Sequence, residues 1–334
     1  MTSDVPAQKS ALNVVMGAMT FGEEGKDGAR VHDLKDVEAI LDVFLKHGHR
    51  ELDTARVYCD GTSEEYLGKI DWQKKGILME TKLYPSVAAA RTHSPEDLRK
   101  FLMLSLKALN TDKLEMWYLH GPDRSVPYEA TLTAVNDLHK EGYFKRFGIS
   151  NYMAWEVAEM VGICKQHGYI QPTAYQGIYN AIHRGVEPEL FPCLRKFGIS
   201  FYEFNPLAGG FFTGRYNSVD EKPESGSRFD PERVQGKNYR KRYWNEPYFN
   251  ALKAIRAVVE QHNLTMAEVA LRWISHHSLM RREHGDAVLI GASSLNHIEQ
   301  NLIDLEKGPL PEAVLKALDE AWLSVKPYAS NYYH

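Results

Sequence analysis

The sequence predicts an α/β fold in which eight parallel strands close into a (β/α)₈ TIM barrel, with a long loop after strand 7 and C-terminal helices. Short apolar, β-branched runs alternate with amphipathic runs along the chain, and a count of eight such runs favours a closed barrel over an open sheet. An open dinucleotide-binding sheet should carry a GxGxxG turn after its first strand. Here Gly22, Gly25 and Gly28 have a different spacing, and no helix follows them. We therefore expect residues 1–334 to form a single barrel domain.

Most of the expected strands are followed by a segment whose apolar residues have helical spacing. The clearest helix start is Ser94, a good N-cap residue, which is followed by Pro95 and by two acids in the first turn. The expected strands cover residues 12–21, 51–55, 76–83, 115–120, 146–150, 173–179, 200–205 and 286–291. The expected helices cover residues 37–47, 64–70, 94–109, 128–141, 154–167, 187–196, 295–305 and 311–323, and an aromatic tail completes the C-terminal region of 295–334.

One connection is too long for an ordinary barrel loop. Residues 209–245, after the seventh strand, are rich in glycine, proline and charge. A solvated surface and a lid that binds an anion over the carboxyl end of the barrel are both open interpretations of this segment. The lid interpretation is based on its basic residues, which are Arg228, Arg233, Lys237, Arg240, Lys241 and Arg242.

The composition excludes several classes of protein. A hydrophobic content of 43% and a charged content of 25% are those of a soluble globular protein. The net charge of −4 and the pI of about 6.4 argue against a general nucleic-acid binder. We expect a cytoplasmic protein without a membrane span, because no apolar run is long enough, residues 1–12 lack the apolar core of a signal peptide, and the three cysteines show no CxxC spacing. No HxH or HExxH motif suggests a metal.

Four ionisable side chains are expected at one end of the barrel, where such folds place their active sites. Asp53, Lys82 and His120 lie at the ends of the second, third and fourth expected strands, and Tyr58 lies in the loop after the second. We expect Asp53 to pair with Lys82, and His120 to donate a hydrogen bond to a carbonyl oxygen. A cation beside Tyr58 should lower the pKa of its phenol. Because no nucleophile or metal cluster accompanies this set, its natural partner is a hydride donor.

These stretches resemble the aldo-keto reductase superfamily. The resemblance runs in order from about residue 13 to the C-terminus and is carried by residues 16–22, 52–58 (LDTARVY), 81–82, 118–120, 147–152 and 204–210 (FNPLAGG). Residues 174–180, 189–194 and 284–288 are similar to the branch that contains aflatoxin-aldehyde and succinic-semialdehyde reductases. Any one motif would be weak, but the ordered set is highly specific.

The resemblance implies a catalytic tetrad of Asp53, Tyr58, Lys82 and His120, with Tyr58 as proton donor, and NADPH bound in extended form across the barrel mouth. It places Asp53, Ser150, Asn151 and Gln176 near the nicotinamide and Phe204 against its face. It assigns the pyrophosphate to the loop residues Asn205, Pro206, Leu207, Gly209, Gly210 and Arg215, and the adenosine and 2′-phosphate to Arg228, Gly291, Ser293, Ser294, Gln300 and Asn301.

The adenosine segment departs from the broader family pattern. Many reductases carry Lys-Ser and an arginine for the 2′-phosphate, whereas this chain has Gly291-Ala292 and His297. The expected preference for NADPH over NADH therefore depends on the arginines of the lid.

The resemblance also implies the substrate contacts, which are Tyr58, His120, Tyr239, Arg242 and His334. An arginine suits a carboxylate-bearing aldehyde, because its planar fork binds carboxylates through two hydrogen bonds. The branch often ends in an arginine that reaches the substrate. Because His334 is shorter and mostly neutral at pH 7, we expect a weaker preference for acidic aldehydes than is usual in the branch.

The expected function is NADPH-dependent reduction of aldehydes, and also of dialdehydes or ketones, to alcohols. The alternative is a cofactor-binding regulatory subunit of the channel-associated type, with slow or no turnover. Such subunits tend to carry long N-terminal segments, whereas the first strand here is expected by about residue 13. A short-chain dehydrogenase would need its tyrosine and lysine four residues apart, and Tyr66 and Lys69 have the wrong spacing. The related branch often forms dimers, so a homodimer is also expected.

Overall fold

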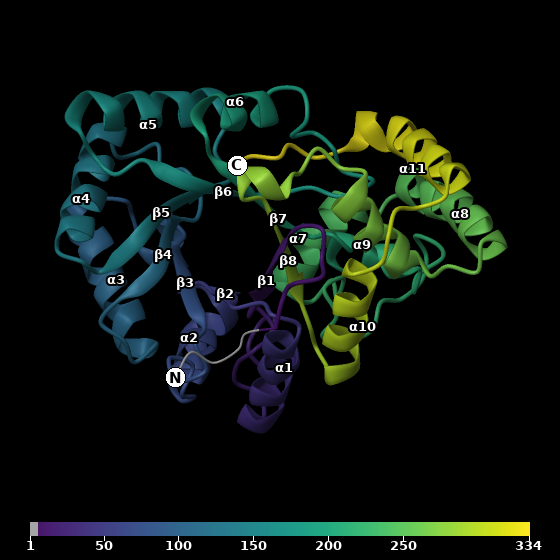
Figure 1. The fold of residues 1–334 in the computed structure, drawn as a ribbon, viewed down its shortest axis with the longest axis horizontal. Helices are drawn as coiled ribbons and strands as arrows, with labels where there is room; N and C mark the ends of the chain where they lie inside the picture. The colour runs from purple at the N-terminus through teal and green to yellow at the C-terminus, as the bar shows by residue number, and fades with distance from the viewer. Residues whose placement is uncertain (1–5) are drawn as a thin grey trace.

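The computed structural model describes residues 6–334, and its centre is a closed barrel of eight parallel strands (Figure 1). Each strand pairs with the next, and β8 closes the ring against β1, where Asn13 lies opposite Ala287 and Gly17 opposite Gly291. The predicted fold class is therefore confirmed. The strands are β1 (Asn13–Gly17), β2 (Glu51–Asp53), β3 (Leu78–Leu83), β4 (Leu114–Leu119), β5 (Phe144–Ser150), β6 (Pro172–Ile178), β7 (Ser200–Phe204) and β8 (Ala287–Gly291).

Helices surround the barrel and cover the outer faces of its strands (Figure 1). Ser94 caps the third of them as predicted, because its side chain accepts a hydrogen bond from Asp97 N. The helices are α1 (Leu34–Lys46), α2 (Thr62–Gly68), α3 (Pro95–Ala108), α4 (Tyr128–Lys140), α5 (Ala154–His167), α6 (Leu190–Phe197), α7 (Val234–Tyr243), α8 (Glu246–Gln261), α9 (Met266–His276), α10 (Leu295–Leu305) and α11 (Glu312–Val325).

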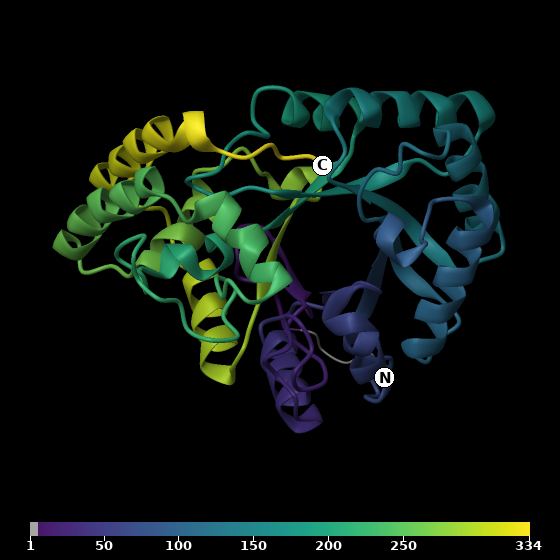
Figure 2. The same cartoon turned by 180° about the vertical axis from the view of Figure 1, so that it is seen from behind.

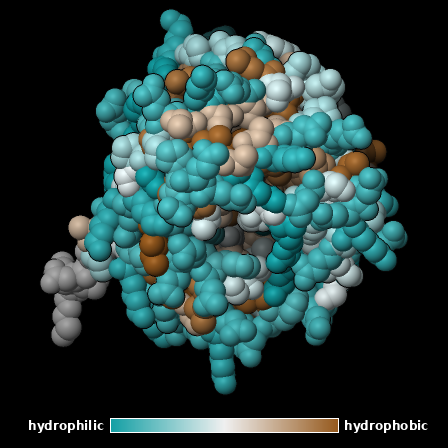
Figure 3. All heavy atoms as spheres, turned by 90° about the vertical axis from the view of Figure 1, so that its right-hand side faces the viewer, coloured by the Kyte–Doolittle hydropathy of each residue, from teal (hydrophilic) through white to brown (hydrophobic). Residues whose placement is uncertain are grey.

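The C-terminal region packs first on the outside of the barrel and then returns to its mouth. Helix α11 lies along α8 at the edge of the molecule, and the chain after it runs back towards the centre (Figure 2). The surface on this side is mainly hydrophilic, with hydrophobic atoms in separate groups (Figure 3). In the part of the chain that the structure covers, every helix is too short or too polar to cross a membrane.

Buried apolar side chains form two groups, because alternate residues of each strand face inwards and outwards. The larger group lies between the strands and the helices. The smaller group lies inside the barrel and consists of Val15, Met116, Tyr118, Ala174, Tyr202, Ala287 and Leu289. These few apolar residues leave several interior positions to charged and polar side chains.

The largest difference from the sequence-based expectation is in residues 209–245, which were expected to be a loop. A 3-10 segment, Ala208–Thr213, opens the connection, and helix α7 occupies Val234–Tyr243. Helix α7 has no apolar stripe at helical spacing and buries only Gly236, Tyr239 and Tyr243, so periodicity could not reveal it. Smaller differences occur at the ends of elements. For example, the first strand was expected to cover residues 12–21, but β1 stops at Gly17. The chain turns after that residue, and Phe21 N donates a hydrogen bond to Ala18 O.

Candidate active site

The structure brings the four predicted catalytic residues together at the carboxyl end of the barrel. Asp53 ends β2, Lys82 is the penultimate residue of β3, and His120 directly follows β4. Tyr58 begins the short 3-10 turn after β2. Tyr58, His120 and Asp53 line a cavity of about 1780 Å³ at this end, and Lys82 is fully buried beside them.

Asp53 and Lys82 form a buried ion pair, as predicted. Lys82 Nζ donates to Asp53 Oδ1 at 2.5 Å, to Asp53 Oδ2 and to Thr54 O at 2.8 Å. The two side chains are only 0% and 2% exposed, so water does not weaken their attraction. Gln176 Nε2 also donates to Asp53 Oδ1, at 2.9 Å. The lysine therefore has one fixed position beneath the cavity.

The phenol of Tyr58 remains protonated, which corrects the prediction that its pKa would be lowered. Burial and then the charge of Asp53 raise the pKa of Tyr58 well above its usual value. Lys82 Nζ does lie 5.0 Å from the centre of the Tyr58 ring. Burial is the largest cause, however, and the charge of Asp53 acts in the same direction, so the nearby ammonium does not lower the pKa of the phenol. Tyr58 is thus an acid that releases its proton only when a base appears next to it.

His120 is held as a neutral imidazole beside Tyr58. Its ring meets the Tyr58 ring edge-on, with 5.8 Å between the ring centres. Burial and then the charge of Lys82 lower the pKa of His120 well below its usual value. Within residues 6–334, His120 Nδ1 is buried without a hydrogen-bond partner. A neutral imidazole can donate one hydrogen bond without adding a positive charge to the site.

Residues from β5, β6 and β7 form the next part of the cavity wall. Asn151 follows β5 in the left-handed conformation, with φ of 65°, and its Nδ2 donates to His120 O at 2.8 Å and to Ser150 Oγ at 2.9 Å. Asn151, Gln176 and Phe204 line the cavity as predicted. Ser150 does not line it; this fully buried residue holds Asn151 in place from behind.

The loop after β7 turns sharply along the cavity. Gly209 and Gly210 have φ of 69° and 96°, a conformation that side chains disfavour. A Cβ added to Gly209 would lie 2.1 Å from the ring of Tyr239. The Tyr239 hydroxyl in turn donates to Asn205 Oδ1 at 2.8 Å. The predicted loop residues Asn205, Pro206, Leu207, Gly209, Gly210 and Arg215 all line the cavity.

Several basic side chains line the cavity. Arg228 forms no ion pair or side-chain hydrogen bond with residues 6–334, and its guanidinium lies 5.7 Å from the centre of the Tyr239 ring. Arg215 is paired with Glu224 at 2.5 Å. Lys241, one of the basic residues already noted in the lid, also lines the cavity. Arg30 lines it too and was missed by the sequence analysis, because it belongs to the distant loop after β1. Of the predicted adenosine residues, Gly291, Ser293, Gln300 and Asn301 line the cavity, whereas Ser294 caps α10 through its Oγ, which accepts from His297 N.

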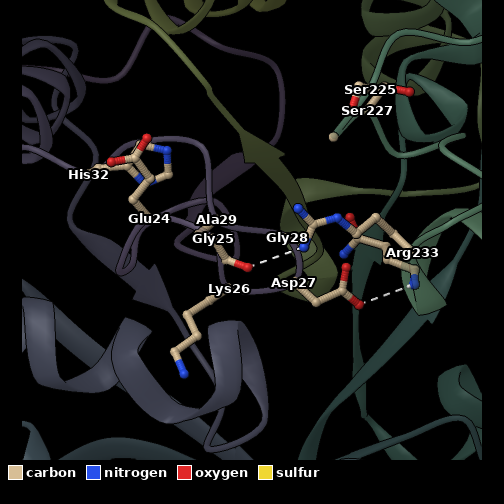
Figure 4. A pocket seen from close by; sticks show the side chains of 12 residues that line it. Glu24, Gly25, Lys26, Asp27, Gly28, Ala29, His32, Ser225, Ser227 and Arg233 are labelled. Carbon is tan, nitrogen blue, oxygen red and sulfur yellow. Dashed lines mark hydrogen bonds between the residues drawn. The ribbon is translucent and has the colours of Figure 1, made fainter.

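The lid residues contact the loop after β1, which closes the cavity on one side. Arg30 Nη2 donates to Gly226 O at 2.8 Å, and Arg233 Nη1 donates to Gly25 O at 3.1 Å. Gln235 N donates to Asp27 Oδ2 at 3.2 Å. Figure 4 shows the last two contacts beside a smaller pocket of about 310 Å³ between the two segments. The lid is thus fastened across the barrel mouth from β7 to β1.

Helix α7 and the chain end form another part of the cavity wall. Arg242 lines the cavity and forms no ion pair within residues 6–334; its guanidinium lies 5.8 Å from the centre of the Tyr239 ring. His334 N donates to Asn151 O at 3.1 Å, and its ring meets that of Tyr84 edge-on at 6.3 Å. Tyr84 and Tyr333 also line the wall and were not predicted, although Tyr84 directly follows β3 and could have been inferred from that position.

The cavity suits an elongated ligand with an amide at one end and phosphates further along. Amide side chains lie near the tetrad, the loop with left-handed Gly209 and Gly210 lines the cavity, and the Arg228 guanidinium, which has no carboxylate partner among residues 6–334, lies 5.7 Å from the centre of the Tyr239 ring. Asn205 Nδ2 is buried without a partner among the described residues, so it is free to donate to such a ligand. Among residues 6–334, no group of three or more His, Cys, Asp or Glu side chains is placed to hold a metal ion.

A closed barrel that gathers a phenol, an ammonium, a carboxylate and an imidazole beside a large cavity is the arrangement of an oxidoreductase that reduces carbonyl groups. The chain belongs to the aldo/keto reductase family, whose family model matches residues 13–323.

Three relatives show how similar the chain is to known members. It is 46% identical over 338 residues to aldo-keto reductase pigE of Monascus ruber, with 98% of each chain covered. It is 50% identical over 296 residues to aldo-keto reductase MYCFIDRAFT_156381 of Pseudocercospora fijiensis, with 88% of this chain and 100% of that one covered. It is 42% identical over 329 residues to human aflatoxin B1 aldehyde reductase member 4, with 96% of each chain covered. Both the family and the branch named from the sequence are therefore supported.

Proposed function

We propose that the protein reduces aldehydes to alcohols with NADPH, and that Tyr58 donates the proton. The observation that carries this proposal is the state of Tyr58, whose phenol faces the cavity, keeps its proton and has the Lys82 ammonium 5.0 Å from its ring centre. Reduced nicotinamide, when bound, supplies a hydride to the carbonyl carbon. The residues of the chain bind and orient the aldehyde and supply the proton.

Each member of the tetrad has a distinct task in this proposal. Tyr58 donates its proton to the carbonyl oxygen as negative charge develops there. The Lys82 ammonium stabilises the Tyr58 phenolate that forms, and Asp53 keeps Lys82 in position. Neutral His120 donates a hydrogen bond to the same carbonyl oxygen and so orients it.

The preference for NADPH over NADH is assigned to the lid and its neighbours. Arg228 has no carboxylate partner within residues 6–334 and can therefore bind a phosphate without first breaking an ion pair. Arg215 would have to leave Glu224, and Arg30 contributes positive charge from the opposite loop. A lid that binds an anion is thus favoured over the solvated surface that the sequence left open.

The substrate class is assigned from the part of the wall that α7 and the chain end form. Arg242 is unpaired within residues 6–334 and lines the cavity together with His334, so a carboxylate-bearing aldehyde can bind there. The shorter His334 gives a weaker preference for such acids than an arginine would. The relatives named as aflatoxin B1 aldehyde reductases support aldehydes as the substrate class, and the reduction of dialdehydes or ketones stays a prediction. A cytoplasmic location and a homodimer remain predictions.

The test is NADPH oxidation with 4-nitrobenzaldehyde and with succinic semialdehyde, in the native chain and in Tyr58→Phe. We expect turnover to collapse in the variant while NADPH binding, followed by fluorescence, persists. Tight NADPH binding with negligible turnover in both proteins would instead indicate a cofactor-binding subunit. No contact among the described residues favours that alternative.

A further inference from the structure

Charged and polar side chains continue from the tetrad down the inside of the barrel. Glu80 lies two residues before Lys82 on β3, and Glu51 lies two residues before Asp53 on β2. Alternation along a strand points each member of these pairs to the barrel interior. A carboxyl group in this position is unusual, because the interior of such barrels is filled mainly by bulky branched apolar residues.

Hydrogen bonds join these interior groups towards the amino-terminal end of the barrel. The Tyr118 hydroxyl donates to Glu80 Oε2 at 3.1 Å, and the Tyr202 hydroxyl donates to Glu51 Oε2 at 2.8 Å. Arg146 Nη2 donates to the Tyr202 oxygen at 3.2 Å, and its Nη1 lies 3.8 Å from Glu51 Oε2. Glu80 is fully buried, whereas the side chains of Glu51 and Arg146 are 23% and 29% exposed. One hydrogen-bonded set, of Glu51, Tyr202 and Arg146, is therefore partly exposed, and a second set, of Tyr118 and Glu80, is buried next to it beneath the cavity, where Glu51 affects the pKa of Glu80.

Glu80 holds a proton at pH values where an exposed glutamate is ionised. Burial, then Glu51 and then Asp53 raise the pKa of Glu80 well above its usual value, and Arg146 opposes this effect. Its Oε1 is buried without a partner among the described residues. A carboxylate with an unsatisfied oxygen would be costly in this interior, whereas a carboxylic acid is tolerated.

The buried set of Tyr118 and Glu80 lies beside Lys82. Lys82 Nζ lies 5.7 Å from the centre of the Tyr118 ring, whose hydroxyl contacts Glu80. Burial lowers the pKa of Lys82, so its ammonium gives up a proton more readily than an exposed lysine does, although the charge of Asp53 opposes this effect. The ammonium is in turn next to the Tyr58 ring.

We propose that Glu51, Glu80 and Lys82 return a proton from solvent at the amino-terminal end of the barrel to Tyr58 after each turnover. This inference depends on the proposed reductase function. Once Tyr58 has given its proton to the carbonyl oxygen, its phenolate takes a proton from the Lys82 ammonium. The Lys82 amine then takes one from the Glu80 carboxyl group, and Glu80 regains one from solvent through Glu51. One proton thus enters for each carbonyl reduced, which balances the hydride that the carbonyl carbon gains.

The ligands of the cavity give this route its purpose. Tyr58 lines the cavity in which the cofactor and the aldehyde would bind and would separate it from water at the mouth, whereas Glu51 remains open to water at the other end of the barrel. Glu80 touches neither substrate nor cofactor and acts through Lys82, so it is a positioning residue for the proton and not a catalytic residue. Its removal should therefore affect the return of the proton and leave the first proton donation intact.

The test compares Glu80→Gln with Glu203→Gln, a matched control. Both glutamates are fully buried and both have a raised pKa, but Glu203 lies between Tyr202 and Phe204 on β7 and so faces the helices. Stopped-flow NADPH oxidation separates the first turnover from the later ones. In Glu80→Gln we expect a first turnover at the native rate, then a kcat lowered roughly tenfold to a hundredfold, a larger solvent deuterium isotope effect on kcat, and an unchanged KM.

Two further measurements keep the result interpretable. Glu51→Gln, at the partly exposed end, should give the same fast first turnover and slow steady state, and it replaces Glu80→Gln if that variant does not fold. Infrared difference spectra recorded during turnover should show a change in a protonated carboxyl band in the native chain and in Glu203→Gln, and no such change in Glu80→Gln.

The proton route is refuted if the native chain is active and both interior variants match it in kcat and isotope effect. It is also refuted if the first turnover is slowed as much as the later ones, because the effect would then be structural. Failure of the reductase function itself has a different signature, namely a native chain with no NADPH oxidation.

Discussion

Removing one partner of the buried pair of Lys82 and Asp53 should cost about as much stability as removing both charges at once. The two side chains are 0% and 2% exposed, so either charge left alone would be buried without its main partner. Removing one partner of a buried ion pair typically costs about 3–5 kcal/mol. Gln176 and Thr54 O still provide partial compensation, so we expect about 3 kcal/mol for Lys82→Met and for Asp53→Asn.

The double variant Asp53→Asn/Lys82→Met decides whether the two residues act as a pair. Independent effects would add to about 6 kcal/mol, whereas a paired site should lose only about 3 kcal/mol, because the second substitution removes the charge stranded by the first. The measurement is the urea midpoint from circular dichroism, compared at constant m-value.

An exposed pair provides the control for this experiment. Lys74 and Asp71 are 81% and 73% exposed, and their removal should change stability by at most about 1 kcal/mol. Additive losses in the double variant, or single losses as small as those of the exposed pair, would refute the reasoning.

Four other substitutions test separate parts of the structure. Arg228→Met should raise the KM for NADPH about tenfold while changing that for NADH little, because only NADPH has the 2′-phosphate; equal changes would argue against the assignment of Arg228. His334→Arg should raise kcat/KM for succinic semialdehyde relative to an uncharged aldehyde of the same length, and an unchanged ratio would remove His334 from the substrate site. Gly209→Ala should lower stability by about 1–2 kcal/mol and weaken NADPH binding, because φ is 69° and the added Cβ meets the Tyr239 ring; thermal melting and fluorescence titration measure the two effects. Burial raises the pKa of Glu203, so its contribution to folding is most favourable below the unfolded pKa of about 4.5 and declines as the pH rises. Glu203→Leu should therefore stabilise the protein by about 1–3 kcal/mol near pH 8, with a smaller gain near pH 4 in urea titrations at both pH values.

Local sequence signals were enough to predict the barrel and the tetrad. Asp53, Lys82 and His120 each follow a short apolar run, and strand ends in a closed barrel converge on one face. Helix α7 was missed because its exposed positions are polar and because a glycine lies within it. The helix is specified instead by the packing of Tyr239 against the cavity and of Tyr243 in the core.

Properties that depend on distant residues could not be predicted from local patterns. The direction of the Tyr58 pKa shift depends on burial and on the charge of Asp53, both of which require the assembled barrel. Arg30 reaches the lid from the loop after β1, almost 200 residues away in the sequence. Ser150 and Ser294 were assigned to the cofactor through the family resemblance, whereas in the structure Ser150 Oγ accepts from Asn151 and Ser294 caps the start of α10.

The pairing of β1 with β8 also has a consequence for biosynthesis. The last tetrad residue, His120, leaves the ribosome about 170 residues before Gly291, the end of the strand that closes the ring. At about 5–20 residues per second this interval lasts on the order of 10–30 s, during which β1 has no partner on one side. An unpaired strand edge invites association with other chains. The period of greatest aggregation risk therefore falls during synthesis, after the catalytic residues exist and before the ring that positions them can close.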